Sequence, residues 1–84
     1  MKNNAKSCVN VINETKRMIF INGEGRIIEI KKNFHSCDIK LKNSHYTILE
    51  SFKLSDFDYD IYQFEMCVQE IIDDTLADGY KQIQ

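Results

Sequence analysis

Short runs of β-branched and aromatic residues fill the first half of the chain, and this pattern predicts strands. Residues 17 to 22 and 26 to 31 are two such runs. They are separated by Gly23-Glu24-Gly25, and Asn22 and the glycines can adopt the positive φ angles of a tight turn. The two runs are therefore expected to form an antiparallel hairpin.

Two further strands follow the hairpin. Residues 37 to 42 alternate polar and apolar side chains with a period of two, which is typical of a strand with one solvated face. After a turn at Asn43-Ser44, residues 45 to 52 continue as a strand. One of its faces is predicted to carry Tyr46, Ile48 and Phe52, and the other His45, Thr47, Leu49 and Ser51. Residues 8 to 12 are interpreted as a further strand, the alternative being the end of a short N-terminal helix.

The hydrophobic pattern changes at Ser55 and becomes helical. Apolar residues recur along one stripe at helical spacing: Phe57, Ile61, Phe64, Val68, Ile71 and Ile72. Ser55 is a suitable N-cap and Gly79 a suitable terminator, so a helix of about 22 residues, about 33 Å long, is expected. The predicted fold class is α+β: an antiparallel sheet of four or five strands with one long C-terminal amphipathic helix packed on one face.

Length and composition indicate one soluble domain, residues 1 to 84, with residues 1 to 6 as a flexible polar tail. The 84 residues are 43% hydrophobic and 29% charged, as in ordinary globular domains. No apolar run approaches the roughly 20 residues that span a bilayer, and the polar N-terminus does not resemble a secretory signal. A cytoplasmic location with no membrane contact is therefore expected.

Charge is distributed very unevenly along the chain. Residues 1 to 53 contain ten basic and five acidic side chains, a net charge of +5, whereas residues 54 to 84 contain one basic and eight acidic side chains, a net charge of −7. The eight carboxylates are Asp56, Asp58, Asp60, Glu65, Glu70, Asp73, Asp74 and Asp78. Such asymmetry usually marks an interaction surface or tail.

The side of the predicted helix opposite its apolar stripe is the candidate binding surface. At 100° per residue this side presents Tyr59, Tyr62 and Met66 to solvent. Tyr and Met side chains are enriched in protein interfaces. The predicted partner-binding residues are Tyr59, Tyr62, Met66, Glu70, Asp73, Asp74 and Asp78. The alternative is that both tyrosines simply lie along the helix surface or against a sheet edge.

The acidic residues fall into two groups with different explanations. Asp56, Asp58 and Asp60 lie near the helix start, where the helix dipole stabilises negative charge, so a structural role suffices. The acids of the last turns, Asp73, Asp74 and Asp78 among them, are locally unfavourable, and such positions often serve function. The alternative is that lysines and arginines of the sheet neutralise them within the fold.

Catalytic and metal-binding interpretations are weaker. The three cysteines lie 29 and 30 positions apart, a spacing that fits neither a disulfide framework nor a paired-cysteine metal motif. His35 and Cys37 could form a zinc site with His45 or Cys8, or a nucleophile pair, but a third orienting group and a pocket are not evident. We expect no enzymatic activity, no cofactor and no metal.

Two functions remain from the sequence. Its size, charge layout and sheet-plus-helix plan resemble those of small acidic phage proteins that block restriction or CRISPR nucleases, and its richness in Ile, Lys and Asn indicates an AT-rich genome of a kind common in low-GC bacteria and their phages. This resemblance implies an anti-CRISPR or anti-restriction type of inhibitor, a DNA mimic whose partner is a basic nucleic-acid-binding protein. The alternative is an immunity, antitoxin or adaptor protein, or a homodimer, joined through the Tyr and Met face. Direct nucleic-acid binding through the sheet is disfavoured because the lysines are scattered.

Overall fold

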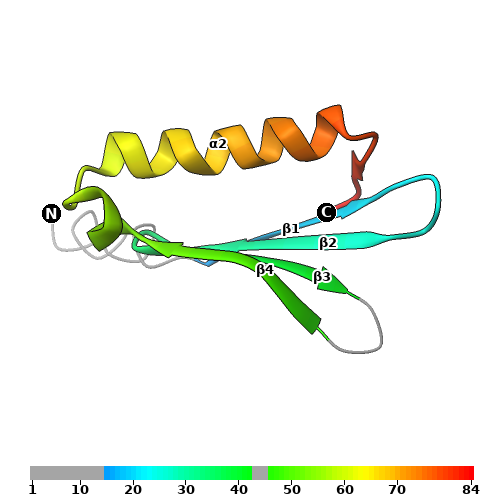
Figure 1. The fold of residues 1–84 in the computed structure, drawn as a ribbon, viewed down its shortest axis with the longest axis horizontal. Helices are drawn as coiled ribbons and strands as arrows, with labels where there is room; N and C mark the ends of the chain where they lie inside the picture. The colour runs from blue at the N-terminus through cyan, green and yellow to red at the C-terminus, as the bar shows by residue number, and fades with distance from the viewer. Residues whose placement is uncertain (1–14, 43–45) are drawn as a thin grey trace, which may run out of the picture.

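The computed structural model describes residues 15–42 and 46–84. These residues form a five-stranded antiparallel sheet with a single helix, α2, across one of its faces (Figure 1). The elements are β1 (Lys16–Ile21), β2 (Ile27–Lys32), β3 (Ser36–Lys42), β4 (Tyr46–Lys53), a 3-10 turn (Leu54–Phe57), α2 (Ile61–Ala77) and β5 (Lys81–Gln82). The strand order is β4-β3-β2-β1-β5. The predicted α+β class, with a C-terminal helix on an antiparallel sheet, is confirmed.

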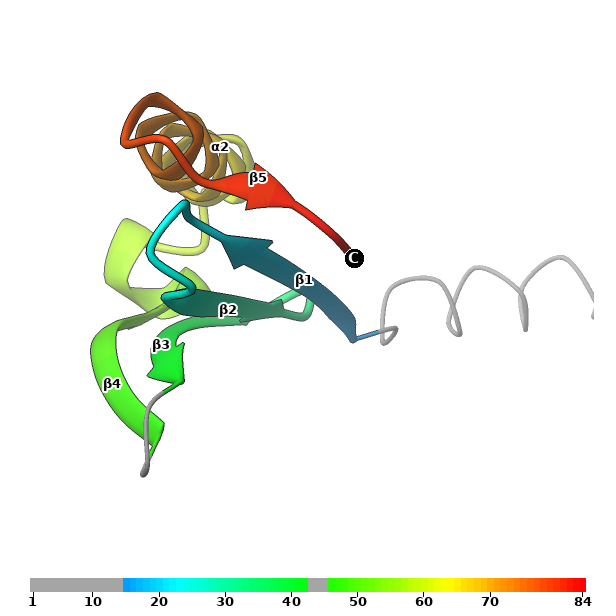
Figure 2. The same ribbon diagram turned by 90° about the vertical axis from the view of Figure 1, so that its right-hand side faces the viewer.

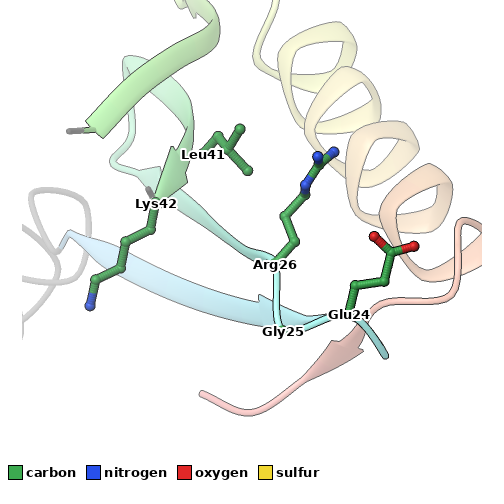
Figure 3. A pocket seen from close by; sticks show the side chains of 5 residues that line it. All are labelled: Glu24, Gly25, Arg26, Leu41 and Lys42. Carbon is green, nitrogen blue, oxygen red and sulfur yellow. The ribbon is translucent and has the colours of Figure 1, made fainter. Parts of the chain in front are cut away.

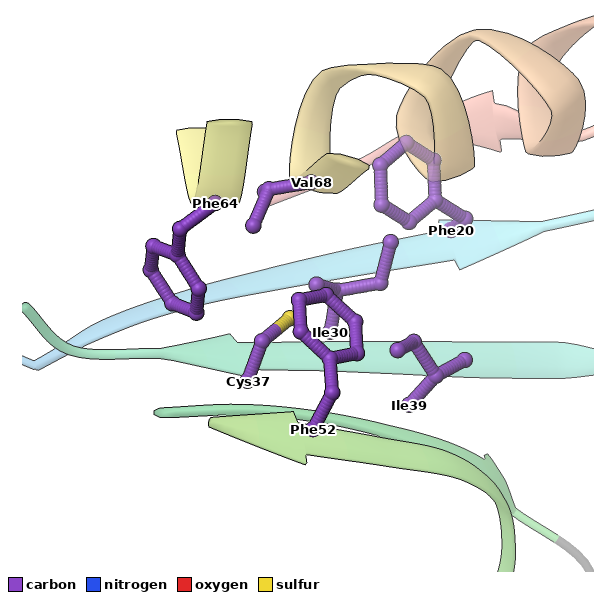
Figure 4. Close-up of a cluster of buried hydrophobic side chains, with 7 residues drawn as sticks. All are labelled: Phe20, Ile30, Cys37, Ile39, Phe52, Phe64 and Val68. Carbon is purple, nitrogen blue, oxygen red and sulfur yellow. The ribbon is translucent and has the colours of Figure 1, made fainter. Parts of the chain in front are cut away.

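The hydrophobic core lies between α2 and the sheet (Figure 4). Alternate residues of the strands point toward the helix and meet its buried stripe, as the side-chain period of two requires. Its buried members are Phe20, Ile30, Cys37, Ile39 and Phe52 from the strands and Phe64 and Val68 from the helix. Phe52, Phe57 and Phe64 pack edge to face, with ring centroids 5.6 to 6.1 Å apart. These aromatic contacts fasten the start of the helix to the end of β4.

The hairpin between β1 and β2 follows the prediction. The side-chain oxygen of Asn22 accepts hydrogen bonds from the backbone N–H groups of Glu24, at 3.0 Å, and Arg26, at 2.8 Å. Gly25 has a φ of 83°, a conformation that residues with a side chain rarely adopt. The side chain of Asn22 and the left-handed glycine together close the turn.

The helix starts later than its sequence pattern predicts. Asp58 and Tyr59, with φ angles of 54° and 61°, interrupt the helical backbone after the 3-10 turn. The N-cap is then Asp60, whose carboxylate accepts from the N–H groups of Tyr62 and Gln63. The prediction of Ser55 as N-cap was therefore wrong. The observed helix has 17 residues and a length of about 25 Å.

The predicted end of the helix is correct. Gly79 has a φ of 91°, and its N–H donates to the carbonyl of Leu76 at 3.1 Å. A glycine in the left-handed region after the last helical turn is a common way to satisfy the final carbonyl groups. The chain then turns back and adds β5 to the sheet.

A β-bulge in β4 changes which side chains share a face. Ile39 pairs with Glu50 but Lys40 pairs with Ile48, so Leu49 is an extra residue in the strand. Because one added residue reverses the alternation, Ile48 and Phe52 lie on opposite faces of the sheet. Their predicted placement on one face was wrong, since a period-two pattern takes no account of bulges.

The fifth strand is β5 at the C-terminal end, which the sequence did not predict (Figure 2). It pairs with the end of β1, with Ile21 opposite Lys81 and Phe20 opposite Gln82. The strand predicted at residues 8 to 12, the tail at residues 1 to 6 and the turn at Asn43-Ser44 lie outside the described residues. Within the described part of the chain, no helix is long and apolar enough to span a membrane.

Candidate protein-binding surface

The outer side of α2 is exposed along its whole length. Phe64, Val68 and Thr75 point into the molecule, and the helix has no described neighbour on its opposite side (Figure 1). Tyr62 is 68% exposed and Met66 is 43% exposed. The sequence predicted both side chains on this side from the helical period alone.

Tyr59 and Ile61 extend the exposed hydrophobic area beyond the helix start. Tyr59 is 75% exposed, although it lies in the left-handed loop before the helix rather than within it. Ile61 is 55% exposed, whereas its place in the predicted stripe had it buried. Phe57 in the 3-10 turn packs against Phe52 and Phe64. Together Tyr59, Ile61, Tyr62 and Met66 form what we call the apolar end of the surface.

The C-terminal half of the helix carries the acidic end, which comprises Glu70, Asp73, Asp74 and Asp78. All four side chains are exposed. Among the described residues, the ion pairs are Arg17 with Glu29, at 3.1 Å, and Lys32 with Glu65, at 2.7 Å, so none involves the acidic end. One oxygen of Asp73 accepts a hydrogen bond from the amide of Gln69 at 3.0 Å. The fold thus leaves these four charges without a described cationic partner.

The position of the acidic end is unfavourable for helix stability. The last turn of α2 has no basic side chain, and negative charge there opposes the helix dipole. Glu70 with Asp74, and Asp74 with Asp78, are like-charge pairs four residues apart, each destabilising by about 0.2 to 0.5 kcal/mol. By contrast Asp60 caps the helix and Asp56 accepts from the Lys53 N–H at 2.8 Å. Asp56 and Asp60 therefore have a local structural explanation that the acidic end lacks.

Glu50 of β4 is a further carboxylate that lies near Cys67 of α2, and no pattern in the sequence marks it. The pKa of the Cys67 thiol is raised, first by burial and then by the charges of Glu50 and Glu70. Both carboxylates therefore lie close enough to Cys67 to influence it. The register that follows the bulge at Leu49 puts Glu50 opposite Ile39, on the helix side of the sheet.

The residues considered for catalysis or zinc binding are not arranged for either role in the described structure. Cys37 is completely buried, and burial, followed by the charge of Asp38, raises the pKa of its thiol to about 12. It is therefore protonated at neutral pH. His35 is exposed and packs edge to face against Phe34, with centroids 4.6 Å apart. The described residues contain no metal-ligand group of three or more, and Cys8 and His45 are not among them.

A shallow hollow of about 350 Å³ lies beside the β1–β2 turn (Figure 3). Glu24, Gly25, Arg26, Leu41 and Lys42 line it. Arg26 and Leu41 extend toward the side of the sheet that carries α2, and Lys42 extends away from it (Figure 3). Because its lining mixes both charge signs with one apolar side chain, this hollow does not define a ligand class.

Comparisons with protein-family models, with curated proteins and with solved structures gave no significant match to this chain.

Proposed function

We propose that this protein is a small binding protein without enzymatic activity that inhibits its target by mimicking nucleic acid. The acidic end of α2 enters the basic, nucleic-acid-binding groove of a partner protein, and the apolar end packs beside that groove. The observation that carries this proposal is the exposure of four carboxylates, unpaired among the described residues, where they destabilise their own helix. Local choices that oppose stability without compensation are frequent at functional sites.

The spacing of the charges is suited to mimicry. Glu70 and Asp78 are eight residues apart, which corresponds to about 12 Å along the helix axis at about 1.5 Å per residue. Four charges over that length give one charge per about 4 Å, and a DNA strand carries one phosphate per about 3.4 Å of axis. A groove lined by Lys and Arg for a nucleic-acid backbone would therefore meet a similar linear charge density.

The apolar end supplies hydrophobic contact area, and with it affinity that charge alone does not give. Complementary charge accelerates association and selects partners, whereas buried aromatic side chains contribute most of the affinity in many interfaces. Tyr59, Tyr62 and Met66 lie at the N-terminal end of the same surface, and Tyr62 and Met66 are held by one rigid helix. Aromatic and acidic groups on one rigid element can engage a partner together.

A capture experiment with matched variants tests the proposal. The immobilised protein is exposed to bacterial lysate at about 50 mM and about 300 mM salt, which shortens the Debye length by more than half. Basic nucleic-acid-binding proteins should be retained at low salt and lost at high salt. The variant Asp73→Lys should reduce the retained amount by about tenfold, equivalent to about 1.4 kcal/mol, and Asp73→Lys with Asp74→Lys should abolish retention.

The matched control is Glu24→Lys, which changes the net charge by the same amount as Asp73→Lys. Glu24 lies in the exposed β1–β2 turn and is not part of the outer surface of α2. This variant should retain the partner as well as the unmodified protein. If the Asp73→Lys/Asp74→Lys protein stayed folded and captured the same proteins as strongly, nucleic-acid mimicry would be wrong.

The exposure of Ile61 favours a second candidate, an immunity, antitoxin or adaptor protein that binds through the apolar end alone. Ile61, Tyr59 and Tyr62 form an exposed hydrophobic group that needs no charged partner. In that case capture would resist salt, Tyr62→Ala would abolish it, and Asp73→Lys would leave it unchanged. The same experiment therefore separates the two candidates.

A further inference from the structure

In residues 15–42 and 46–84, no element covers the face of the sheet turned away from α2 (Figure 2). Hydrophobic side chains lie on this face. The register places Ile21 directly opposite Ile27 on this face. Ile19 and Ile83 lie side by side, since the Ile83 N–H donates to the Ile19 carbonyl at 2.8 Å and both line one hollow. Solvated faces of antiparallel sheets are normally polar. Four isoleucines grouped at one corner of such a face therefore indicate that another molecule or segment binds there.

Cations surround these isoleucines. The hollow, about 330 Å³ in volume, is lined by Ile19, Ile27 and Ile83 together with Arg17, Glu29 and Lys42. Glu29 is only 7% exposed, and Arg17 pairs with it at 3.1 Å, so its negative charge is already compensated. The register also places Lys31 and Lys81 on this side. We call the surface formed by Ile19, Ile21, Ile27, Ile83, Lys31, Lys42 and Lys81 the open face.

The two layers of the molecule carry opposite charge. The described residues of the sheet up to Lys53 contain eight basic and four acidic side chains, a net charge of +4. Residues 54–84, which include α2, contain one basic and eight acidic side chains, a net charge of −7. These totals include both faces of the sheet. On the face turned away from α2, the register of β1, β2, β3 and β5 places the basic side chains of Arg17, Lys31, Lys40, Lys42 and Lys81 and the acidic side chains of Glu29 and Asp38, a net charge of +3. That face is thus apolar and cationic, and the outer side of α2 is apolar and acidic.

From this complementarity we infer that the open face binds the outer side of α2 of a second copy of the chain. Tyr62 and Met66 of one copy pack on Ile19 and Ile83 of the next, and the acidic end lies against the cations of the open face. Pairing two open faces instead would bring Lys31, Lys42 and Lys81 against the same lysines, which electrostatic repulsion opposes. The contact is therefore between unlike surfaces.

The geometry makes this association open-ended. The outer side of α2 and the open face lie on opposite sides of the molecule (Figure 1), so an assembly of any length still presents one free helix surface at one end and one free open face at the other. Contacts of this kind add further copies unless a ring closes. One side of a 17-residue helix is a small contact area, which belongs to the weak, transient class of interfaces. Association is expected only at high protein concentration.

Sedimentation of the purified full chain tests the inference. Between about 20 μM and about 0.5 mM, a range that populates weak interfaces, the weight-average mass should rise to at least about twice that of the monomer. The rise should disappear at about 300 mM salt, because exposed charges are then screened.

Two variants, each with one disabled surface, give the sharper result. Glu70→Lys with Asp73→Lys disables the helix surface, and Lys42→Ser with Ile83→Ser, which removes a cation and an apolar contact without adding negative charge, disables the open face. Each variant alone should remain monomeric, and an equimolar mixture should form a one-to-one dimer that does not grow. The controls Glu24→Lys and Lys53→Glu, which change exposed charges at the β1–β2 turn and the end of β4, should associate like the unmodified chain.

Three results would overturn the inference. The first is an unmodified chain that stays monomeric in low salt at about 0.5 mM, a concentration at which weak interfaces form. The second is an association that stops at a dimer and that still occurs in both double variants. The third is a set of methyl NOEs from Ile19 and Ile83 to residues 1 to 14 of the same chain, which would show that its own N-terminal segment occupies the open face. Because these measurements need no foreign partner, their failure would leave the proposed inhibitory function untouched, and failure of that function would not affect them.

Discussion

The side chain of Phe64 connects several elements of the molecule. Its ring is fully buried and packs edge to face against Phe52 and Phe57, with the ammonium group of Lys32 5.8 Å from its centroid. Such a position joins the start of α2, the 3-10 turn, β2 and β4. Phe64 should therefore contribute far more to the free energy of unfolding than its helix neighbour Ile61.

Replacing these two side chains gives a matched test. Phe64→Ala should lower the free energy of unfolding by about 3 to 5 kcal/mol, because it removes a buried ring and leaves a cavity. A domain of this size is stable by only about 5 to 15 kcal/mol, so the variant should be close to unfolded. Ile61→Ala removes an exposed side chain and should change stability by less than about 1 kcal/mol. Urea denaturation measures both values, and losses of equal size would contradict the described packing.

The buried thiol of Cys37 predicts a dependence of stability on pH. Its pKa is about 12 in the folded protein and 9.0 as the ordinary value. A raised folded-state pKa means that stability is complete below about pH 9 and falls as the pH rises from about 9 to about 12, by up to about 1.4 kcal/mol per pH unit. Cys37→Ala should make this fall shallower, whatever it does to stability at neutral pH. Equal slopes for the two proteins between pH 9 and pH 11 would contradict the burial of the thiol.

At the level of single residues, periodicity predicted orientation only where the backbone is regular. It placed Phe64 and Val68 inside, and Tyr62 and Met66 outside. It failed for Ile61 because the count assumed that Phe57 belonged to the same helix, and Phe57 instead packs from a separate turn. No composition or spacing signal marks such an interruption.

Among the elements, α2 has a C-terminal half that works against its own stability. Asp73→Lys with Asp74→Lys removes two unfavourable interactions with the helix dipole and converts the like-charge pairs of position 74 into opposite-charge pairs. Each substitution should contribute about 0.3 to 1 kcal/mol, so the variant should be more stable by about 0.6 to 2 kcal/mol. Thermal unfolding at low salt measures this gain.

The control for this gain is Glu24→Lys, which should change stability by no more than about 0.5 kcal/mol because it lies in an exposed turn. A double variant less stable than the unmodified protein would contradict the description of the acidic end. It would mean that Asp73 and Asp74 stabilise the fold. A more stable variant that no longer captures the partner would link the instability of the helix end to binding.

The sequence predicted the elements that are marked by residues within or next to the element itself. The β1–β2 hairpin, the strands β3 and β4 and the end of α2 each have a turn residue or a period that marks them. The left-handed pair at Asp58 and Tyr59 has no such mark, because neither residue is a glycine. The strand β5 was not predictable either, since it has two residues and exists only through its pairing with β1.

For the molecule as a whole, charge and architecture coincide. The basic part of the sequence contributes β1 to β4 of the sheet, and the acidic residues 54–84 contribute α2 above the sheet together with the short strand β5. The candidate surface was predictable from the sequence to the extent that helical spacing fixes which side faces solvent. The position of Glu50 beneath α2 and the apolar character of the open face were not predictable, because strand register and a bulge determine them.

The central claim is that the acidic end of α2 occupies the nucleic-acid groove of a protein partner. Competition between this protein and duplex DNA for a captured partner tests it most directly. Added DNA should release the partner from the immobilised protein, and the partner should bind either one but never both at once. A stable ternary complex of partner, DNA and this protein would contradict the account.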